Sequence, residues 1–340
     1  MKNKQKVIWI IIILTIVAGL TLAVLGFVLG ASKTLYLDRS GLHIAGNEII
    51  HIEEYDLEPF KNIHVDVRGT NVKFVASDSF GLEIYSDNTQ WEWSQKNDTL
   101  IVSLITTTRI QLMSFDFFSH ERNYIKIFIP LGTVLDTVSI EANSGSVEIG
   151  DLTANSIEVS CRTGNIHINN ITSDYLHINT TSGNITGSNL NAKNLISTLR
   201  TGRASLHTIN TENFSIECTS GSITVTNAEF NNASFKVQTG NITLNDVTSL
   251  GLNAQTTSGI IRISGDFSGK SIVQARTGNV FMSTSGHKND YSFDLSVRTG
   301  SITLDGERRS GERTIISGLE MENHIKILTT SGNIDVEFTR

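Results

Sequence analysis

Arg162-Thr-Gly-Asn165 and Thr181-Ser-Gly-Asn184 are two copies of the phrase that decides the fold of this chain. Seven successive intervals between the glycines of this phrase are each 19 residues long. The glycines of the regular series are Gly145, Gly164, Gly183, Gly202, Gly221, Gly240, Gly259 and Gly278. Further copies follow at longer spacings around Gly300 and Gly332. A fixed period of about 20 residues without helical patterning indicates a stacked solenoid.

Within one repeat, apolar residues alternate with polar ones as in half-buried β-strands. Counted from the repeat glycine as position 0, positions +2 and +4 are mostly apolar, as in Val147 and Ile149. Positions +12 and +14 repeat this pattern, as in Ile157 and Val159, and position +7 adds a single apolar residue, Leu152. The pattern predicts two strands per coil, each paired in parallel with its copies about 4.8 Å above and below. Because parallel connections are overwhelmingly right-handed, we expect an all-β right-handed parallel β-helix with 19 residues per coil.

Two positions mark the turns of the coil. Glycine at position 0 supplies a backbone geometry or a close approach that other residues adopt at a cost. Position +6 favours a turn because an Asx side chain can bond the backbone just ahead. Its occupants are Asp151, Asn170, Asn189, Thr208, Asn227 and Asp246. No helical pattern follows the glycines, so we interpret them as structural and not as phosphate-binding loops.

The N-terminus predicts a membrane anchor. Lys2, Lys4 and Lys6 form a basic tail over residues 1–6, and the uncharged run 7–29 is long enough for a transmembrane helix. The lysines place the N-terminus in the cytoplasm and the rest of the chain outside the membrane. The alternative is a cleaved signal peptide with a small-residue site near Gly30-Ala31, although the apolar run exceeds the usual length of such a segment.

The remaining chain divides by pattern. Residues 30–47 lack the repeat and are expected to form a stalk or linker. Residues 48–130 show β patterning without the strict period and are expected to form irregular first coils that cap the stack. Residues 131–340 hold the regular repeats, interrupted by two polar insertions. The segment from Ile325 to Phe338 is expected to form the last coil.

Composition and motifs argue against several functions. The chain has a net charge of −7, and removing the three N-terminal lysines leaves −10 for the exported part, so nucleic acid is not an expected partner. Its carboxylates share no repeat position, and its histidines show no metal-binding spacing. We therefore expect no enzyme activity, no catalytic residues, no metal and no cofactor.

An arginine column is the one candidate binding feature. The residue two before the glycine alternates between arginine and threonine, with arginine at Arg162, Arg200, Arg276 and Arg298. This position faces solvent in the predicted coil, and a threonine between arginines separates their charges by about 10 Å. Two interpretations remain open: a spacing that avoids repulsion between like charges, or a stripe that binds an anionic envelope polymer.

The two cysteines test the predicted coil. Cys161 and Cys218 are 57 residues apart, which corresponds to three coils of 19. Three rungs separate them by roughly 14 Å, whereas a disulfide requires Cα atoms within about 7 Å. The sequence therefore predicts two buried, reduced thiols.

The chain resembles a known family. A strand that ends in proline at Ile127-Phe-Ile-Pro130 precedes the glycine phrases, and Thr329-Thr-Ser-Gly-Asn-Ile-Asp-Val-Glu-Phe338 closes the pattern. These features are similar to the bacterial putative-adhesin family of unknown function, which includes LiaG-type membrane-anchored envelope proteins. The similarity covers residues 48–340 and carries no known catalytic residues.

The resemblance and the anchor together imply a function in binding. We expect a membrane-anchored extracytoplasmic β-helix that acts as a binding or scaffolding module at the cell envelope, with cell-wall polymers or envelope proteins as partners. The alternative is an accessory protein of a cell-envelope stress-response signalling system. A polysaccharide lyase or hydrolase is the least favoured interpretation.

Overall fold

The computed structural model describes residues 2–28, 34–38, 41–44, 50–86, 91–104, 110–114, 123–309, 311, 313–317 and 321–339. The chain forms two compact units. The first contains Met1–Ile50, Ser86–Gln90 and Ile105–Arg122, and the second contains His51–Tyr85, Trp91–Leu104 and Asn123–Arg340.

The first unit holds one helix and a small antiparallel sheet. Helix α1 (Lys2–Val28) carries no acidic residue in its first turn, and its described apolar side chains from Val7 to Leu25 are exposed. Strand β1 (Thr34–Asp38) pairs with β2 (Gly41–Ile44) on one side and β9 (Ile110–Ser114) on the other. A helix is thus present where one was expected. A search of the described residues for a helix long and apolar enough to cross a membrane found none.

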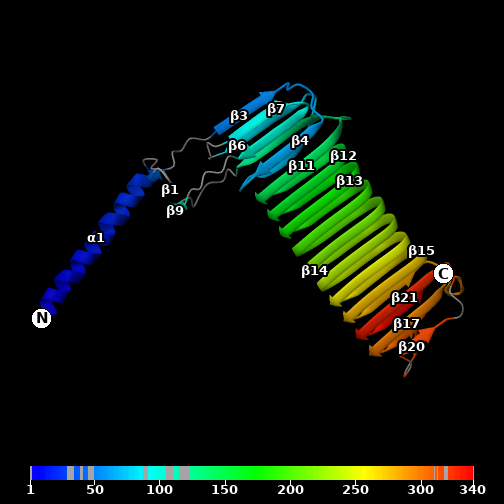
Figure 1. Cartoon of the computed structure of the whole chain (residues 1–340). Helices are drawn as coiled ribbons and strands as arrows, with labels where there is room; N and C mark the ends of the chain where they lie inside the picture. Colours follow the sequence, from blue (N-terminus) through cyan, green and yellow to red (C-terminus); the bar gives the residue numbers. More distant parts are fainter. Residues whose placement is uncertain are drawn as a thin grey trace. The chain divides into compact units, whose positions relative to one another are not determined.

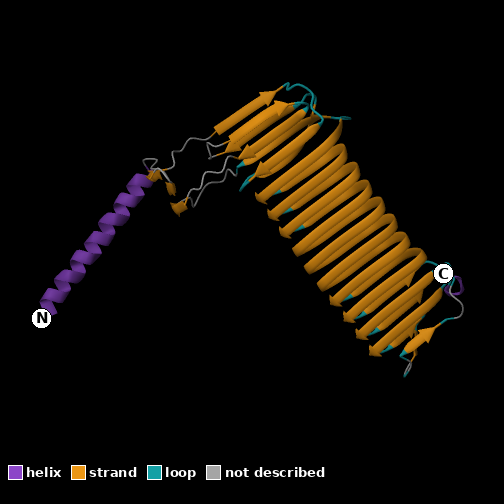
Figure 2. Ribbon diagram, viewed as in Figure 1, coloured by secondary structure: helices purple, strands orange, loops and turns teal. Residues whose placement is uncertain are grey.

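The second unit is a solenoid in which parallel strands stack coil upon coil (Figure 1). Strand covers most of this unit (Figure 2), and in the central coils it continues through the turns, so that β14 runs unbroken for 74 residues. The regular coils consist of β11 (Val134–Ser144), β12 (Val147–Thr163), β13 (Ile166–Ser182), β14 (Ile185–Ser258), β15 (Ile261–Thr277) and β16 (Val280–Thr284). Equivalent positions pair at the predicted 19-residue offset, for example Val147 with Ile166.

Each coil has three sides and not the two that the pattern predicted. The ladder between β12 and β13 is interrupted at Asp151 and Asn155, which isolates a short third side over residues 152–154. Position +7 is therefore the first inward residue of a real strand segment. Position +9, which we did not predict, is the second inward residue of that segment, as in Ala154. The apolar signal of position +9 is weak because it also holds serine and threonine, as in Ser173 and Thr211.

The repeat glycine is required mainly because adjacent coils approach each other closely. A Cβ atom added at Gly221 would lie 1.7 Å from the carbonyl oxygen of Gly202, and the backbone φ of Gly221 is +153°. Beside the glycines, asparagine side chains bridge adjacent coils: the backbone N–H of Asn184 donates to the side-chain oxygen Oδ1 of Asn165 (3.0 Å). The glycine phrase thus forms a corner at which the main chains of adjacent coils approach closely. At this corner an asparagine side-chain oxygen accepts a hydrogen bond from the backbone of the next coil.

The second corner works differently from the prediction. The residues at position +6 adopt the left-handed conformation, with φ of +55° at Asn170. Their side chains bond one another along the stack and not the backbone ahead: Nδ2 of Asn170 donates to Oδ1 of Asp151 (2.8 Å), and Nδ2 of Asn189 donates to Oδ1 of Asn170 (2.9 Å). Asparagine and aspartate fit this corner because they tolerate positive φ better than other non-glycine residues.

The C-terminal coil is not the last one, which corrects the predicted order. Strand β21 (His324–Ser331) pairs in parallel with β15 on one side and β17 (Ser292–Thr299) on the other. Strand β22 (Ile334–Phe338) lies likewise between β16 and β18 (Ile302–Leu304). Figure 1 shows β21 in red between β15 and β17.

The outermost coil is therefore the one around Gly300, and it is covered by short antiparallel strands. These strands are β19 (Glu307–Arg309), which pairs with β18, and β20 (Thr314–Ile316), which pairs with β17. A single 3₁₀ turn, η1 (Lys288–Asp290), lies in the insertion that precedes β17.

The opposite end of the stack mixes parallel and antiparallel pairing. Parallel pairs join β4 (Asn62–Val67) to β8 (Thr99–Leu104) and β5 (Asn71–Ser77) to β10 (Tyr124–Pro130). Antiparallel pairs join β6 (Gly81–Ser86) to β10 and β7 (Trp91–Lys96) to β8, while β3 (Ile50–Tyr55) pairs with β6. Val72 pairs with Val147, so this end continues the regular coils.

A single apolar core runs through the solenoid. The predicted inward positions are buried, and Val147, Ile149, Ile157 and Val159 are each fully enclosed. Both cysteines are buried and free, as predicted. Burial raises the pKa of each thiol above its usual value.

Candidate functional site

The longest side of each coil presents a groove to solvent. The groove has a volume of about 940 Å³ and runs between two columns of outward side chains. The first is the arginine column at position −2, and the second, which we call the facing column, lies at position −4. In stack order the facing column contains Ser160, Asn179, Thr198, Glu217, Lys236, Gln255, Gln274, Leu328 and Ser296. The floor between the columns is the buried position −3, which includes Cys218, Val237 and Thr256.

The structure places all four predicted arginines on one column. In stack order this column reads Arg162, Thr181, Arg200, Thr219, Gln238, Thr257, Arg276, Thr330 and Arg298. The sequence order, with Arg298 before Thr330, breaks the alternation with threonine. The intercalation of β21 between β15 and β17 restores it, because Thr330 then lies between Arg276 and Arg298.

The four arginines are exposed, and within the described part of the chain no carboxylate lies within 4.0 Å of any of them. Other surface cations on the solenoid do have acidic partners, such as Lys193 with Asp174 (2.7 Å) and Lys326 with Asp294 (2.8 Å). The arginine column therefore offers guanidinium groups that are available to an external anion.

Among the described residues, one ion pair lies inside the groove, and it belongs to the facing column. Nζ of Lys236 lies 2.9 Å from Oε1 of Glu217 on the adjacent coil. Both side chains are about half exposed, and a pair of this kind contributes little to stability. Sequence reasoning missed Lys236 because position −4 shows no repeated residue type.

A second groove lies beside the first on the same side of the coil. It has a volume of about 620 Å³ and is lined in part by Tyr175, Asn194, Asn213 and Leu250. Tyr175 is 56% exposed, and Nδ2 of Asn213 donates to Oδ1 of Asn194 (3.1 Å). An exposed aromatic ring next to a row of amides is a surface on which a sugar can stack and form hydrogen bonds.

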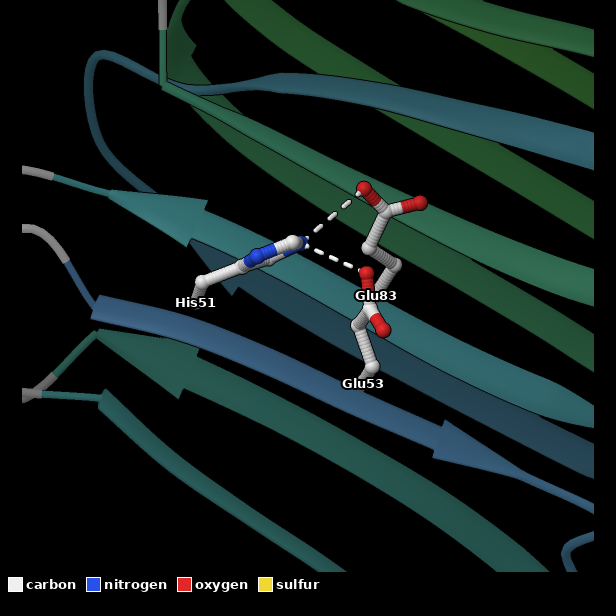
Figure 3. Close-up of side chains that lie close together, drawn as sticks. All are labelled: His51, Glu53 and Glu83. Carbon is white, nitrogen blue, oxygen red and sulfur yellow. Dashed lines mark hydrogen bonds and ion pairs between the residues drawn. The ribbon is translucent and has the colours of Figure 1, made fainter.

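One cluster of potential metal ligands occurs in the irregular first coils (Figure 3). Nε2 of His51 lies 3.0 Å from Oε1 of Glu53 and 3.4 Å from Oε1 of Glu83. Glu83 is already satisfied, because the hydroxyl of Tyr124 donates to Oε1 (2.6 Å) and Nζ of Lys126 lies 3.0 Å from Oε2. A cation would have to compete with this ammonium group, so we interpret the cluster as a structural ion-pair network.

The acid–base properties of Glu83 follow from these contacts. Burial by itself raises the pKa of Glu83, but the hydrogen bonds from Tyr124 and Lys126, the positive charge of Lys126 and the hydrogen bond with His51 together outweigh burial. The net result is a pKa below the usual range. The carboxylate therefore stays ionised and anchors the first coils.

The chemistry of the first groove suits binding. Its described lining residues offer hydroxyl, amide, guanidinium and ammonium groups, with Glu217 as the one carboxylate. Hydrolysis of a glycosidic bond generally requires two carboxyl groups. Cys218 lies in the floor, and its raised pKa disfavours the thiolate that a nucleophile requires.

Comparison with known proteins identifies the family. Solved structures similar to this chain include one described as a putative adhesin from Bacteroides fragilis NCTC 9343, with 14% identity, 86% of this chain and 98% of that chain covered, and a TM-score of 0.37. Another is described as a putative adhesin from Parabacteroides distasonis ATCC 8503, with 10% identity, coverage of 86% and 98%, and a TM-score of 0.34. Comparison with curated proteins found no match. The model of the family described as Toastrack DUF4097 matches residues 60–196 and 182–337, so the chain belongs to the Toastrack DUF4097 family.

Proposed function

We propose that this protein is a binding module that acts at the cell envelope outside the cytoplasm and is held to the membrane by its N-terminal helix. The observation that carries the proposal is the groove of about 940 Å³ along the longest side of the solenoid. A straight groove over many coils fits an extended polymer better than a small molecule. The adhesin descriptions of the similar solved structures agree with a role in binding.

The proposed anchor rests on composition and exposure. Residues 7–29 contain no charged residue, and the preceding six residues contain three lysines. The described apolar side chains of α1 are exposed, with Trp9, Leu14 and Leu22 each more than 60% exposed, and a lipid environment would cover them. The lysines orient such an anchor with the solenoid outside.

The proposal is tested by binding to isolated envelope fractions. The full-length chain is immobilised and mixed separately with purified cell-wall polymers and with solubilised membrane proteins. We expect retention of a wall polymer. Specific retention of a membrane protein without any polymer would instead support the accessory role in envelope stress signalling. Retention of neither would refute the binding function.

The membrane anchor has its own test. The full-length chain should sediment with membranes after a high-salt wash, and a chain that lacks residues 1–33 should not. Recovery of both forms in the soluble fraction would contradict the anchor without affecting the binding proposal.

A further inference from the structure

The walls of the first groove carry a cation on every second coil. The two columns extend over nine successive coils of the intercalated stack, of which all but the first line the groove; the coils are named by the glycines Gly164, Gly183, Gly202, Gly221, Gly240, Gly259, Gly278, Gly332 and Gly300. The first, third, seventh and ninth coils each contribute one arginine of the arginine column. The fifth coil has Gln238 at that position, and there Lys236 of the facing column supplies the cation.

The intervening coils carry no cation on either wall. Their groove residues are Asn179, Thr181, Glu217, Thr219, Gln255, Thr257, Leu328 and Thr330. One cation per two coils corresponds to a repeat of about 10 Å, and the series spans roughly 38 Å. The regularity exists only in the folded stack, because the order of the last two coils is reversed relative to the sequence.

Repulsion between like charges explains why the cations are separated, but not why they recur at a regular spacing. It disfavours cations on adjacent coils, but it does not require a replacement cation where an arginine is missing. Lys236 supplies that replacement on the opposite wall of the groove. The chain as a whole has a net charge of −7, yet the lining of this groove contains four cations (Arg200, Lys236, Arg276 and Arg298) and one carboxylate, Glu217, and Arg162 continues the arginine column one coil beyond the lining.

We infer that the groove binds a linear acidic polysaccharide that carries one anionic group per disaccharide. A pyranose unit in an extended chain is about as long as one coil is high. Anionic groups on every second sugar are therefore spaced like the cations on every second coil. The threonine, asparagine and glutamine side chains on the intervening coils provide hydrogen-bond partners for the hydroxyl groups of the uncharged sugars. This inference rests on the proposed binding function and specifies its ligand class.

Hyaluronan oligomers of about five disaccharides are the probe, because they carry one carboxylate per disaccharide. We expect the full-length chain to bind them in low salt and to lose affinity as salt screens the charges. Carboxyl-reduced oligomers of the same length should bind much more weakly. Oligogalacturonate carries a carboxylate on every sugar, so half of its charges meet no cation, and it should bind no better than hyaluronan.

Variants separate the spacing of the charges from their number. Arg200→Gln and Arg276→Gln should each weaken hyaluronan binding by about two- to fivefold. Glu217→Gln should strengthen it by a similar factor, because Lys236 then loses its acidic partner. The double variant Arg200→Thr/Thr219→Arg keeps the composition and net charge but moves one cation by one coil. We expect it to bind as weakly as Arg200→Gln, with an unchanged melting temperature.

The outcomes distinguish this inference from the proposed function. Wild-type affinity in the double variant, or tighter binding of oligogalacturonate than of hyaluronan, would mean that charge density and not spacing governs binding, and would overturn the inference. Binding of polyglycerol phosphate or anionic phospholipid vesicles in place of hyaluronan would also overturn it. Retention of an envelope polymer together with any of these results would leave the proposed function intact.

Discussion

At the scale of the residue, the repeat glycines set the distance between coils. The carbonyl oxygen of Gly202 occupies the space where a Cβ atom of residue 221 would lie, at 1.7 Å. Gly221→Ala should therefore force the two coils apart at this corner and lower the free energy of unfolding by about 2–4 kcal/mol. Chemical denaturation of the full-length variant measures this loss.

The control for this variant lies three residues away. Thr224 lies between the buried Ile223 and Val225 and faces outward. Thr224→Ser should change the free energy of unfolding by less than about 1 kcal/mol. Equal losses in the two variants would show that the glycine corner is not the point of closest approach.

A buried hydroxyl provides a second residue-scale prediction. Thr180 is 1% exposed, and its Oγ1 lacks a hydrogen-bond partner. Thr256 occupies the same column, and its hydroxyl donates to the carbonyl oxygen of Gly240 (3.1 Å). Thr180→Val should stabilise the protein by about 1 kcal/mol, whereas Thr256→Val should destabilise it by a similar amount. Thermal unfolding of both variants checks the signs, and a loss of stability in both would contradict the unpaired state of Thr180.

The pH dependence of stability tests the network around Glu83. Because the folded pKa of Glu83 is lowered from its ordinary value of 4.5, its contribution to stability is fully present above that value. The contribution is lost as the pH falls through the folded pKa. Glu83→Gln should therefore be less stable than the wild type at pH 7, and the difference should shrink in acid. Glu53→Gln is the control, because Glu53 is exposed and contacts only His51 of this cluster; the same pH response in both would contradict the role of Glu83.

The sequence predicted residue positions well where one residue type repeats. The glycine, the inward apolar positions and the arginine column follow directly from the 19-residue period. Lys236 could not be found in this way. Its role depends on its own coil having glutamine, Gln238, at position −2 in place of an arginine. The position of Thr330 between Arg276 and Arg298 was hidden for a different reason, since it depends on the order of coils in space.

At the scale of the element, β21 is the main departure from the predicted order. Its residues fit the repeat equally well before or after the coil around Gly300, and the polar insertions between the coils allow either path. The structure places β21 between β15 and β17, so its main chain is paired on both sides. The right-handed path of the coils stays a prediction from the general preference of parallel connections.

Hydrogen exchange distinguishes the two orders. Amides in β21 should exchange slowly, because both neighbouring strands must separate before they open. Amides in the short strands β19 and β20 should exchange first, because each pairs with the outermost coil on one side only. Mass spectrometry of peptides that cover β21 (His324–Ser331), β17 (Ser292–Thr299) and β20 (Thr314–Ile316) measures these rates. Faster exchange in β21 than in β17 would place β21 at the end of the stack and would break the two-coil spacing of cations in the groove.

At the scale of the whole molecule, the solenoid is a one-dimensional object. Each coil contacts only the coils above and below it, so stability is a sum over adjacent pairs. The same geometry repeats every outward position at a fixed height. A cation at one outward position is thereby repeated at a fixed spacing along the groove, which gives a surface with periodic charge.

The redox state of the two cysteines tests the spacing of the coils along the stack. Cys161 and Cys218 are both buried and free, and three coils separate them by roughly 14 Å. Because burial raises the pKa of both thiols, iodoacetamide at pH 7 should modify neither in the folded protein. In denaturant without reductant, mass spectrometry should find both thiols modified, because no disulfide protects them. An unmodified pair linked by an intramolecular disulfide would contradict the 19-residue coil, since stacked coils cannot bring the two sulfur atoms into bonding distance.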